Sequence, residues 1–167
     1  MNQRQAFMQA IIEAPDDDTP RLVFADWLDD EGDAARAEFI RTQITLERLE
    51  RWSPRRMDLD ARVEDLLKQH RAAWQGDLPG WARTEEDSYF GPTFRRGFVH
   101  RVEARPEQFA SDWAAIFATA PVQVLVATLL GDQRLGVLEC PGLRRLHRLE
   151  LEYWDDAPDV PALLASP

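Results

Sequence analysis

The sequence contains very little cysteine. Its 167 residues include a single one, Cys140, so no disulfide can form within the chain. This favours a reducing compartment, and we expect a cytoplasmic protein. No apolar run approaches the roughly 18 residues that cross a bilayer, and the first residues lack the charged-then-apolar order of a signal peptide. A secreted or membrane-embedded protein is therefore not expected.

Basic residues are also scarce. The chain has 20 Lys and Arg against 30 Asp and Glu, a formal net charge of -10. A nucleic-acid binder needs a surplus of Lys and Arg on one face, so we expect no nucleic-acid partner. Residues 1–50 carry 12 acids and 5 bases, a net charge of -7. Solvated acidic helix faces explain this excess most simply, although it could also meet a basic protein and act as a decoy for a nucleic-acid binder.

Motifs of known chemistry are missing. The sequence has no P-loop, no G-x-G-x-x-G and no G-x-S-x-G. A thiol nucleophile at Cys140 would need a base such as His100 or His147, but Cys140 stands beside a proline, as does Ser166 in the following segment, which indicates a small packing residue. Three histidines and one cysteine show no metal-ligand spacing. We therefore expect no metal, no cofactor and no enzyme.

Apolar residues at helical spacing predict a module of three or four helices in residues 1–75. Asp18 or Thr19 is expected to cap a helix that ends at Gly32, and Asp33 to cap the next one. The acidic runs 16–18 and 29–33 do not have the spacing of an EF-hand loop, so capping and solvation explain them better than calcium. Residues 76–120 form a bridge, with an alternating strand over 98–103 and a helix around 109–117.

An internal repeat follows in residues 121–167. Val122, Leu125 and Ala127 are matched 24 positions later by Leu146, Leu149 and Leu151, in the L-x-x-L-x-L pattern of a leucine-rich repeat. The linking segment 138–143, which contains Cys140 and the proline after it, recurs in form at residues 164–167. The predicted fold class is therefore α+β, with the helical module capping the first, incomplete coils of a leucine-rich-repeat solenoid. Whether further coils follow residue 167 stays open.

The N-terminal module resembles a known family. The ordered motifs are PRLV (20–23), ADWL (25–28), GD (32–33) and EFIR (38–41). They are similar to the bacterial repeat-companion domain, a module at the front of leucine-rich-repeat proteins, as are the later FRRGFV (94–99) and APV (120–122). Phe24 and Ala34 depart from the usual Tyr and Pro. The resemblance implies a cytoplasmic interaction scaffold without catalytic residues.

A polar group within this module is expected to hold helices together. Asp26 is one helix away from Arg36 and Arg41, so an ion pair could lock two helices, and Arg21 belongs to the same constellation. The rival interpretation is a small-ligand-binding or hydrolytic domain that uses Asp26 and the nearby arginines. A deep pocket with an exposed Asp26 would favour that rival, whereas a buried Asp26 bonded to Arg would oppose it.

The repeat face supplies the candidate partner-binding residues, because side chains between the inward leucines point away from the core. These residues are Val124, Val126, Thr128, Arg148, Glu150, Glu152, Tyr153 and Trp154. If other elements cover this face, Val124 and Val126 are simply core, and the sequence leaves that open. The expected function is a non-catalytic protein–protein interaction module with an unidentified protein partner and an undetermined oligomeric state.

Overall fold

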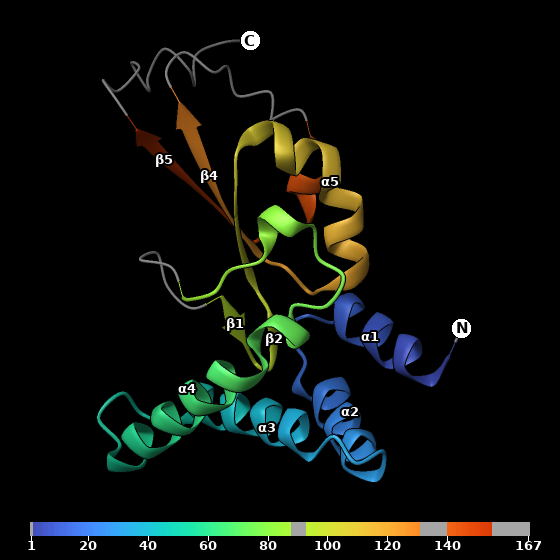
Figure 1. Ribbon diagram of the computed structural model, residues 1–167, viewed down its shortest axis with the longest axis vertical. Helices are drawn as coiled ribbons and strands as arrows, with labels where there is room; N and C mark the ends of the chain where they lie inside the picture. Colours follow the sequence, from blue (N-terminus) through green and yellow to red (C-terminus); the bar gives the residue numbers. More distant parts are fainter. Residues whose placement is uncertain (1, 88–92, 131–139, 155–167) are drawn as a thin grey trace.

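Four helices form the N-terminal part of the chain. The computed structural model describes residues 2–87, 93–130 and 140–154. The helices are α1 (Gln3–Glu13), α2 (Asp18–Asp30), α3 (Ala34–Arg48) and α4 (Pro54–Trp74). Figure 1 shows α2, α3 and α4 together at one end of the molecule, with α1 beside them and the strands above.

Local capping explains where these helices begin and end. The side chain of Asp33 accepts a hydrogen bond from the amide of Arg36 at 3.2 Å, as expected for the start of α3. Gly32 adopts φ of 85°, which confirms the left-handed stop after α2. The cap of α2 is Asp17, one residue before the expected Asp18 or Thr19, because the Asp17 carboxylate accepts from the Thr19 amide.

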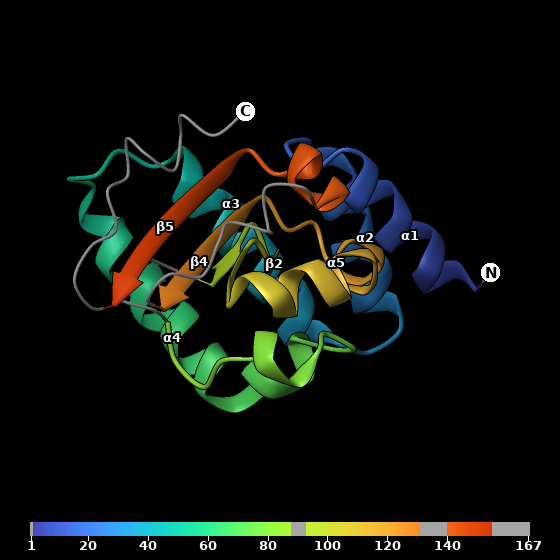
Figure 2. The same ribbon diagram turned by 90° about the horizontal axis from the view of Figure 1, so that it is seen from above.

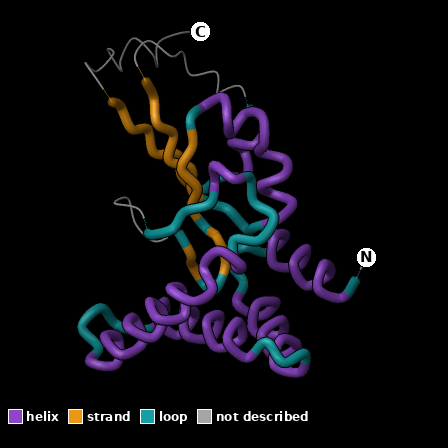
Figure 3. The backbone as a smooth tube through the Cα atoms, in the orientation of Figure 1, coloured by secondary structure: helices purple, strands orange, loops and turns teal. Residues whose placement is uncertain are grey.

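The second part contains two small sheets. Its elements in chain order are η1 (Gly80–Ala82), β1 (Phe94–Arg95), β2 (Phe98–Val99), β3 (Arg101–Ala104), α5 (Pro106–Thr119), β4 (Val124–Leu130), η3 (Pro141–Arg145) and β5 (Arg148–Trp154). β1 and β2 form an antiparallel hairpin, while β3, β4 and β5 form a parallel sheet in that order. Figure 3 shows the hairpin between the helices of the N-terminal part and the three-stranded sheet.

The expected continuous strand over residues 98–103 is wrong. The chain leaves the hairpin at His100, whose amide donates to the Thr93 carbonyl while its own carbonyl accepts from the amides of Gln123 and Val124. Residues before His100 therefore belong to β2, and those after it pair in parallel with β4. Alternation of side chains along the sequence cannot distinguish one strand from two that join end to end.

The leucine-rich-repeat solenoid in the predicted fold class is also wrong. The α+β class agrees with the structure, but the described residues form one three-stranded sheet with α5 along one face (Figure 2) and no stack of like coils. The 24-residue repeat has a narrower meaning: it is the register of two neighbouring strands, in which Leu125 pairs with Leu149 and Ala127 with Leu151. The recurrence expected at 164–167 lies outside the described residues.

One core joins the helices to the sheet. Phe39 of α3 and Leu66 of α4 share a buried cluster with Phe109 of α5 and Leu125 of β4. A second cluster, around Ile11, Phe24, Leu28 and Ile40, holds α1, α2 and α3 together and includes Phe98 of the hairpin. The domain boundaries at residues 75 and 120 stay a prediction. The main core contains residues from both sides of each boundary.

Candidate functional site

The sheet face away from α5 carries the predicted partner-binding residues. Val124 and Val126 are 6% and 1% exposed, so they are core and offer a partner almost no surface. Thr128 is half-buried on the same strand. Tyr153 and Trp154 belong to β5, but their side chains lie outside what the structure describes.

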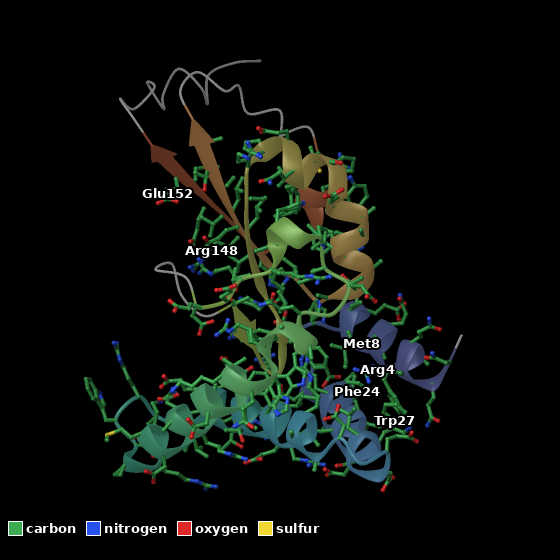
Figure 4. The ribbon with its side chains drawn as sticks, viewed as in Figure 1. Arg4, Met8, Phe24, Trp27, Arg148 and Glu152 are labelled. Carbon is green, nitrogen blue, oxygen red and sulfur yellow. The ribbon has the colours of Figure 1, made fainter. Side chains whose placement is uncertain are left out.

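The charged residues of β5 remain available on this face. Arg148 is exposed, with 67% of its side chain open to solvent, whereas Glu150 and Glu152 are half-buried. Figure 4 shows Arg148 and Glu152 on β5, on the side of the sheet opposite α5. Of the eight predicted contact residues, Arg148, Glu150 and Glu152 are the charged ones, and their side chains can form ion pairs with a partner.

An ion pair crosses β4, the strand that carries the two buried valines. Arg101 of β3 donates to both carboxylate oxygens of Glu150 on β5, at 2.9 and 3.5 Å, across the central strand β4. Burial raises the pKa of Glu150, but hydrogen bonds from Arg101 and Arg148 outweigh that effect and hold the pKa below its ordinary value. The pair spans β4, the strand that carries Val124 and Val126.

A polar ladder lies at the amino-terminal edge of the same sheet. His100, Gln123 and His147 each immediately precede one of the three parallel strands. The amide of Gln123 donates to the His100 carbonyl at 2.9 Å, and the amide of His147 donates to the Gln123 carbonyl at 2.8 Å. Gln123 Nε2 lies 3.2 Å from His147 Nδ1. The sequence analysis missed this ladder, although its 23- and 24-residue spacing follows directly from the strand register.

The loop between α1 and α2 connects the polar ladder to the helices. Gln123 Nε2 donates to the Asp16 carboxylate at 3.2 Å, and this hydrogen bond lowers the pKa of Asp16. Arg96, in the turn of the hairpin, donates to the Asp16 carbonyl at 2.6 Å. The acidic run that follows α1 therefore holds the sheet edge against the N-terminal helices, a role that helix capping alone did not predict.

Stability should fall as the pH drops from 7 to 5, because of His100. Burial first, and then the charges of Arg95 and Arg101, lower its pKa to about 4, although Gln123 and Glu47 act in the opposite direction. The unfolded chain therefore takes up a proton on this histidine near pH 6.5, whereas the folded chain does so only near pH 4. The stability that neutral His100 contributes is complete above pH 6.5 and is lost as the pH falls towards 4. We expect a loss of about 1 to 2 kcal/mol after solvent screening.

Urea unfolding of the wild type and of His100→Gln at the two pH values measures this contribution. The variant should lose most of the pH dependence, while His70→Gln, which removes a histidine stacked on Trp74, should keep it. Equal slopes in all three proteins would show that His100 is not the responsible group.

A long cavity, here called the sheet–helix groove, opens between the sheet and α4. Its volume is about 1720 Å³. The sheet contributes Arg101, Val124 and Arg148, and the polar ladder lines it as well. The opposite side is formed by α4, from Arg56 to Ala72, by Gln75 after it, and by the segment from Gly80 to Asp87. Both basic and acidic side chains line it, and many are already paired, such as Arg71 with Asp87 at 2.9 Å and Arg95 with Glu47 at 2.7 Å.

The predicted polar constellation is only partly brought together. Arg41 of α3 bridges two carboxylates of α2, Asp26 at 2.6 Å and Asp29 at 2.7 Å, so it does join the two helices. Arg21 is buried but turns towards the chain before α2, where the carbonyls of Pro15 and Asp17 accept its hydrogen bonds at 2.7 Å each. Arg36 does not meet Asp26 at all, because its side chain enters the core among aromatic rings.

The rival site at Asp26 gains no support from this geometry. Its side chain is 74% exposed and is paired with Arg41. Asp26 lines neither the sheet–helix groove nor a second cavity that borders Arg36. The exposed carboxylate therefore lies on an open helix surface, without the enclosure that a small-ligand site needs.

The remaining candidates for chemistry are a buried thiol and groups of metal-ligating side chains. Cys140 is buried, at 7% exposure. Within the described ranges, no three or more His, Cys, Asp or Glu side chains are grouped so that they could hold a metal ion. None of the described helices is both long and apolar enough to span a bilayer. Comparison of the chain with family models, with curated proteins and with solved structures gives no match.

Proposed function

We propose that this chain is a cytoplasmic, non-catalytic protein–protein interaction module of a bacterial protein, and that the sheet–helix groove binds an extended segment of its partner. The observation that carries this proposal is the size of the groove. Its volume of about 1720 Å³ exceeds the roughly 300–1,000 Å³ of a typical small-molecule pocket. A stretch of polypeptide is an occupant of the right scale.

The edge of the sheet supports the same occupant. β5 ends the order β3-β4-β5 among the described strands, so one side of its backbone has no strand partner there. An extended segment can add to such an edge by main-chain hydrogen bonds and gain specificity from side chains. Arg148, Glu150 and Glu152 project from β5 with both signs of charge, which suits a partner segment of mixed charge better than the uniformly anionic backbone of a nucleic acid.

The sequence resemblance to the repeat-companion domain supports an interaction role as well, since that family implies scaffolding in the cytoplasm. The proposal for this chain does not need a solenoid. It places the contact on the sheet face and α4, both of which the structure describes.

The only lysine of the chain provides a direct test. Lys68 lies on α4, lines the groove and has a 64% exposed side chain. An amine-reactive cross-linker can attach only there or at the N-terminal amine. We expect a partner captured from an extract of the source cells to be cross-linked through Lys68, and mass spectrometry of the tryptic peptides would identify both ends. Lys68→Arg keeps the charge and should abolish the cross-link without abolishing capture.

A charge-reversal pair tests the sheet side of the groove. Arg148→Glu with Glu152→Arg leaves the net charge unchanged and should reduce capture at least tenfold, because the charges at two positions along β5 are reversed. The control is Arg55→Glu with Asp58→Arg, two exposed α4 residues outside the groove. Equal capture by both double variants, or cross-links to the N-terminus alone, would overturn the proposed surface.

A further inference from the structure

Arg36 is a buried cation without an anionic partner. Arg36 is 5% exposed, and its Nη1 atom has no hydrogen-bond acceptor. No carboxylate among the described residues lies within ion-pair distance of it, whereas Arg101, which is also buried, is paired with Glu150 at 2.9 Å. Arg21 is buried as well, but its Nη atoms donate to backbone carbonyls. Of Arg21, Arg36 and Arg101, only Arg36 therefore has an Nη1 atom without a hydrogen-bond acceptor.

Aromatic rings surround this guanidinium. Its central carbon lies 4.8 Å from the ring centroid of Trp74, 5.1 Å from that of Phe98 and 5.6 Å from that of Phe39. Ring faces attract a cation, but they accept none of the five directed N–H bonds that a guanidinium can donate. The rings therefore hold Arg36 in place and leave its Nη1 without an acceptor.

The guanidinium remains charged at neutral pH. Burial, and then repulsion from Arg4, lowers the pKa of Arg36 to about 9, with partial compensation from Asp33. A pKa near 9 still leaves the group protonated at pH 7. An isolated buried charge is costly unless an opposite charge or acceptor reaches it, so an anion from outside the chain would relieve a defined deficit.

A second cavity borders this residue. It has a volume of about 590 Å³, within the range of small-molecule pockets, and Arg36 lines it. Polar and apolar side chains line it in similar measure, and Met8, Phe24, Trp74 and Phe98 are among the apolar ones. Figure 4 shows Met8 and Phe24 close together where α1 lies beside α2, with Arg4 next to them.

The charge of this cavity favours an anion. Its lining contains two arginines, Arg4 and Arg36, and a single carboxylate, Asp77, which is exposed and forms no ion pair with either. This is the reverse of the chain as a whole, which has a net charge of -10. The cavity shares only Gln75 with the sheet–helix groove, so it is a separate site.

We propose that this cavity binds a small organic carboxylate, whose anionic head pairs with the guanidinium of Arg36 and whose apolar body lies against Met8 and Phe24. A carboxylate is planar and matches the fork of a guanidinium, while the apolar side chains of the lining can hold a hydrocarbon or aromatic body beside it. Arg4 at the surface adds a second positive charge that attracts the ligand. This site is independent of the partner-binding groove.

The first test uses 3-phenylpropionate and its neutral analogue 3-phenylpropionamide in isothermal titration calorimetry with the whole protein. The acid should bind saturably and at least tenfold more tightly than the amide, because the two differ only in the group that meets Arg36. Inorganic phosphate is the third ligand and should bind weakly, since it has no apolar body. Equal binding of acid and amide, phosphate binding as tight as that of the acid, or no saturable binding of the acid at 10 mM would overturn the proposal.

The second test locates the site. Arg36→Met should weaken 3-phenylpropionate binding at least tenfold, and Arg4→Gln about threefold at low salt. Arg55→Gln, a remote exposed arginine, should leave it unchanged. If Arg36→Met fails to fold, the wild-type protein still decides: the NMR signal of the Arg36 Nε–H should shift on titration with the acid and not with the amide. An unmoved Arg36 signal, or unchanged affinity in a folded Arg36→Met, would show that the ligand does not use this cavity.

Discussion

Replacing Gly97 by alanine is expected to destabilise the protein by about 2 to 4 kcal/mol. Gly97 lies in the β1–β2 turn at φ of 86°, which alanine adopts only with strain. An added methyl group would also lie 2.9 Å from Cα of Ile40, a backbone atom of α3. The positive φ accounts for about 1 kcal/mol of the loss and the forced contact for about 1 to 3 kcal/mol more.

The surroundings prevent the turn from moving away. The amide of Gly97 donates to buried Gln43 Oε1 at 2.7 Å, while Gln43 Nε2 donates to the Phe94 carbonyl at 3.4 Å. The hairpin is thus fixed to the same helix that carries Ile40. Relieving the contact would break a buried hydrogen bond, which itself costs about 1 to 3 kcal/mol.

Gly32→Ala is the matched control, because it separates strain from contact. Gly32 has nearly the same φ, 85°, but an added methyl group there meets nothing within 4 Å. Urea unfolding should show a loss of about 1 kcal/mol for Gly32→Ala, from backbone strain alone. If the two variants lose the same amount, the close approach of Gly97 to Ile40 contributes nothing and our account of the hairpin fails.

The sequence predicted the features that depend on neighbouring residues. The cap at Asp33, the stop at Gly32 and the helix around residues 109–117 all follow from short-range patterns, and the structure has each of them. The 24-residue spacing correctly aligned Leu125 with Leu149. The spacing of two strands does not specify what connects them or how many strands follow. The predicted solenoid required both, and it is therefore wrong.

The features that the sequence could not predict depend on distant contacts. Arg36 lies one helix away from Asp26 in sequence, but burial against Trp74 and Phe98 turns its side chain the other way. Val126 is similarly buried in a strand whose two neighbours are joined by an ion pair between residues 49 apart. Neither outcome is visible in local charge or periodicity, and both changed the candidate site.

Removing the ring of Phe39 is expected to cost about 3 to 5 kcal/mol and to loosen the sheet as well as the helices. Phe39 is 0% exposed, with ring centroids 4.5 Å from Trp74 and 5.7 Å from Phe94. It therefore connects α3 to α4 and to the hairpin, within the same cluster as Leu125 of β4. Phe39→Ala opens a cavity at that junction, so native-state hydrogen exchange should show a loss of protection in β4 comparable to that in α3.

Leu28→Ala provides the comparison, since Leu28 is equally buried but belongs to the second cluster. Its loss of about 2 to 5 kcal/mol should reduce protection in α2 more than in β4. If Phe39→Ala left β4 protection at its wild-type level, the helices and the sheet would be separate cooperative units, and the shared cluster would be only a contact between them. Loss of protection in β4 would instead mean that the helical part is necessary for a stable sheet, and hence for the groove that lies between the two.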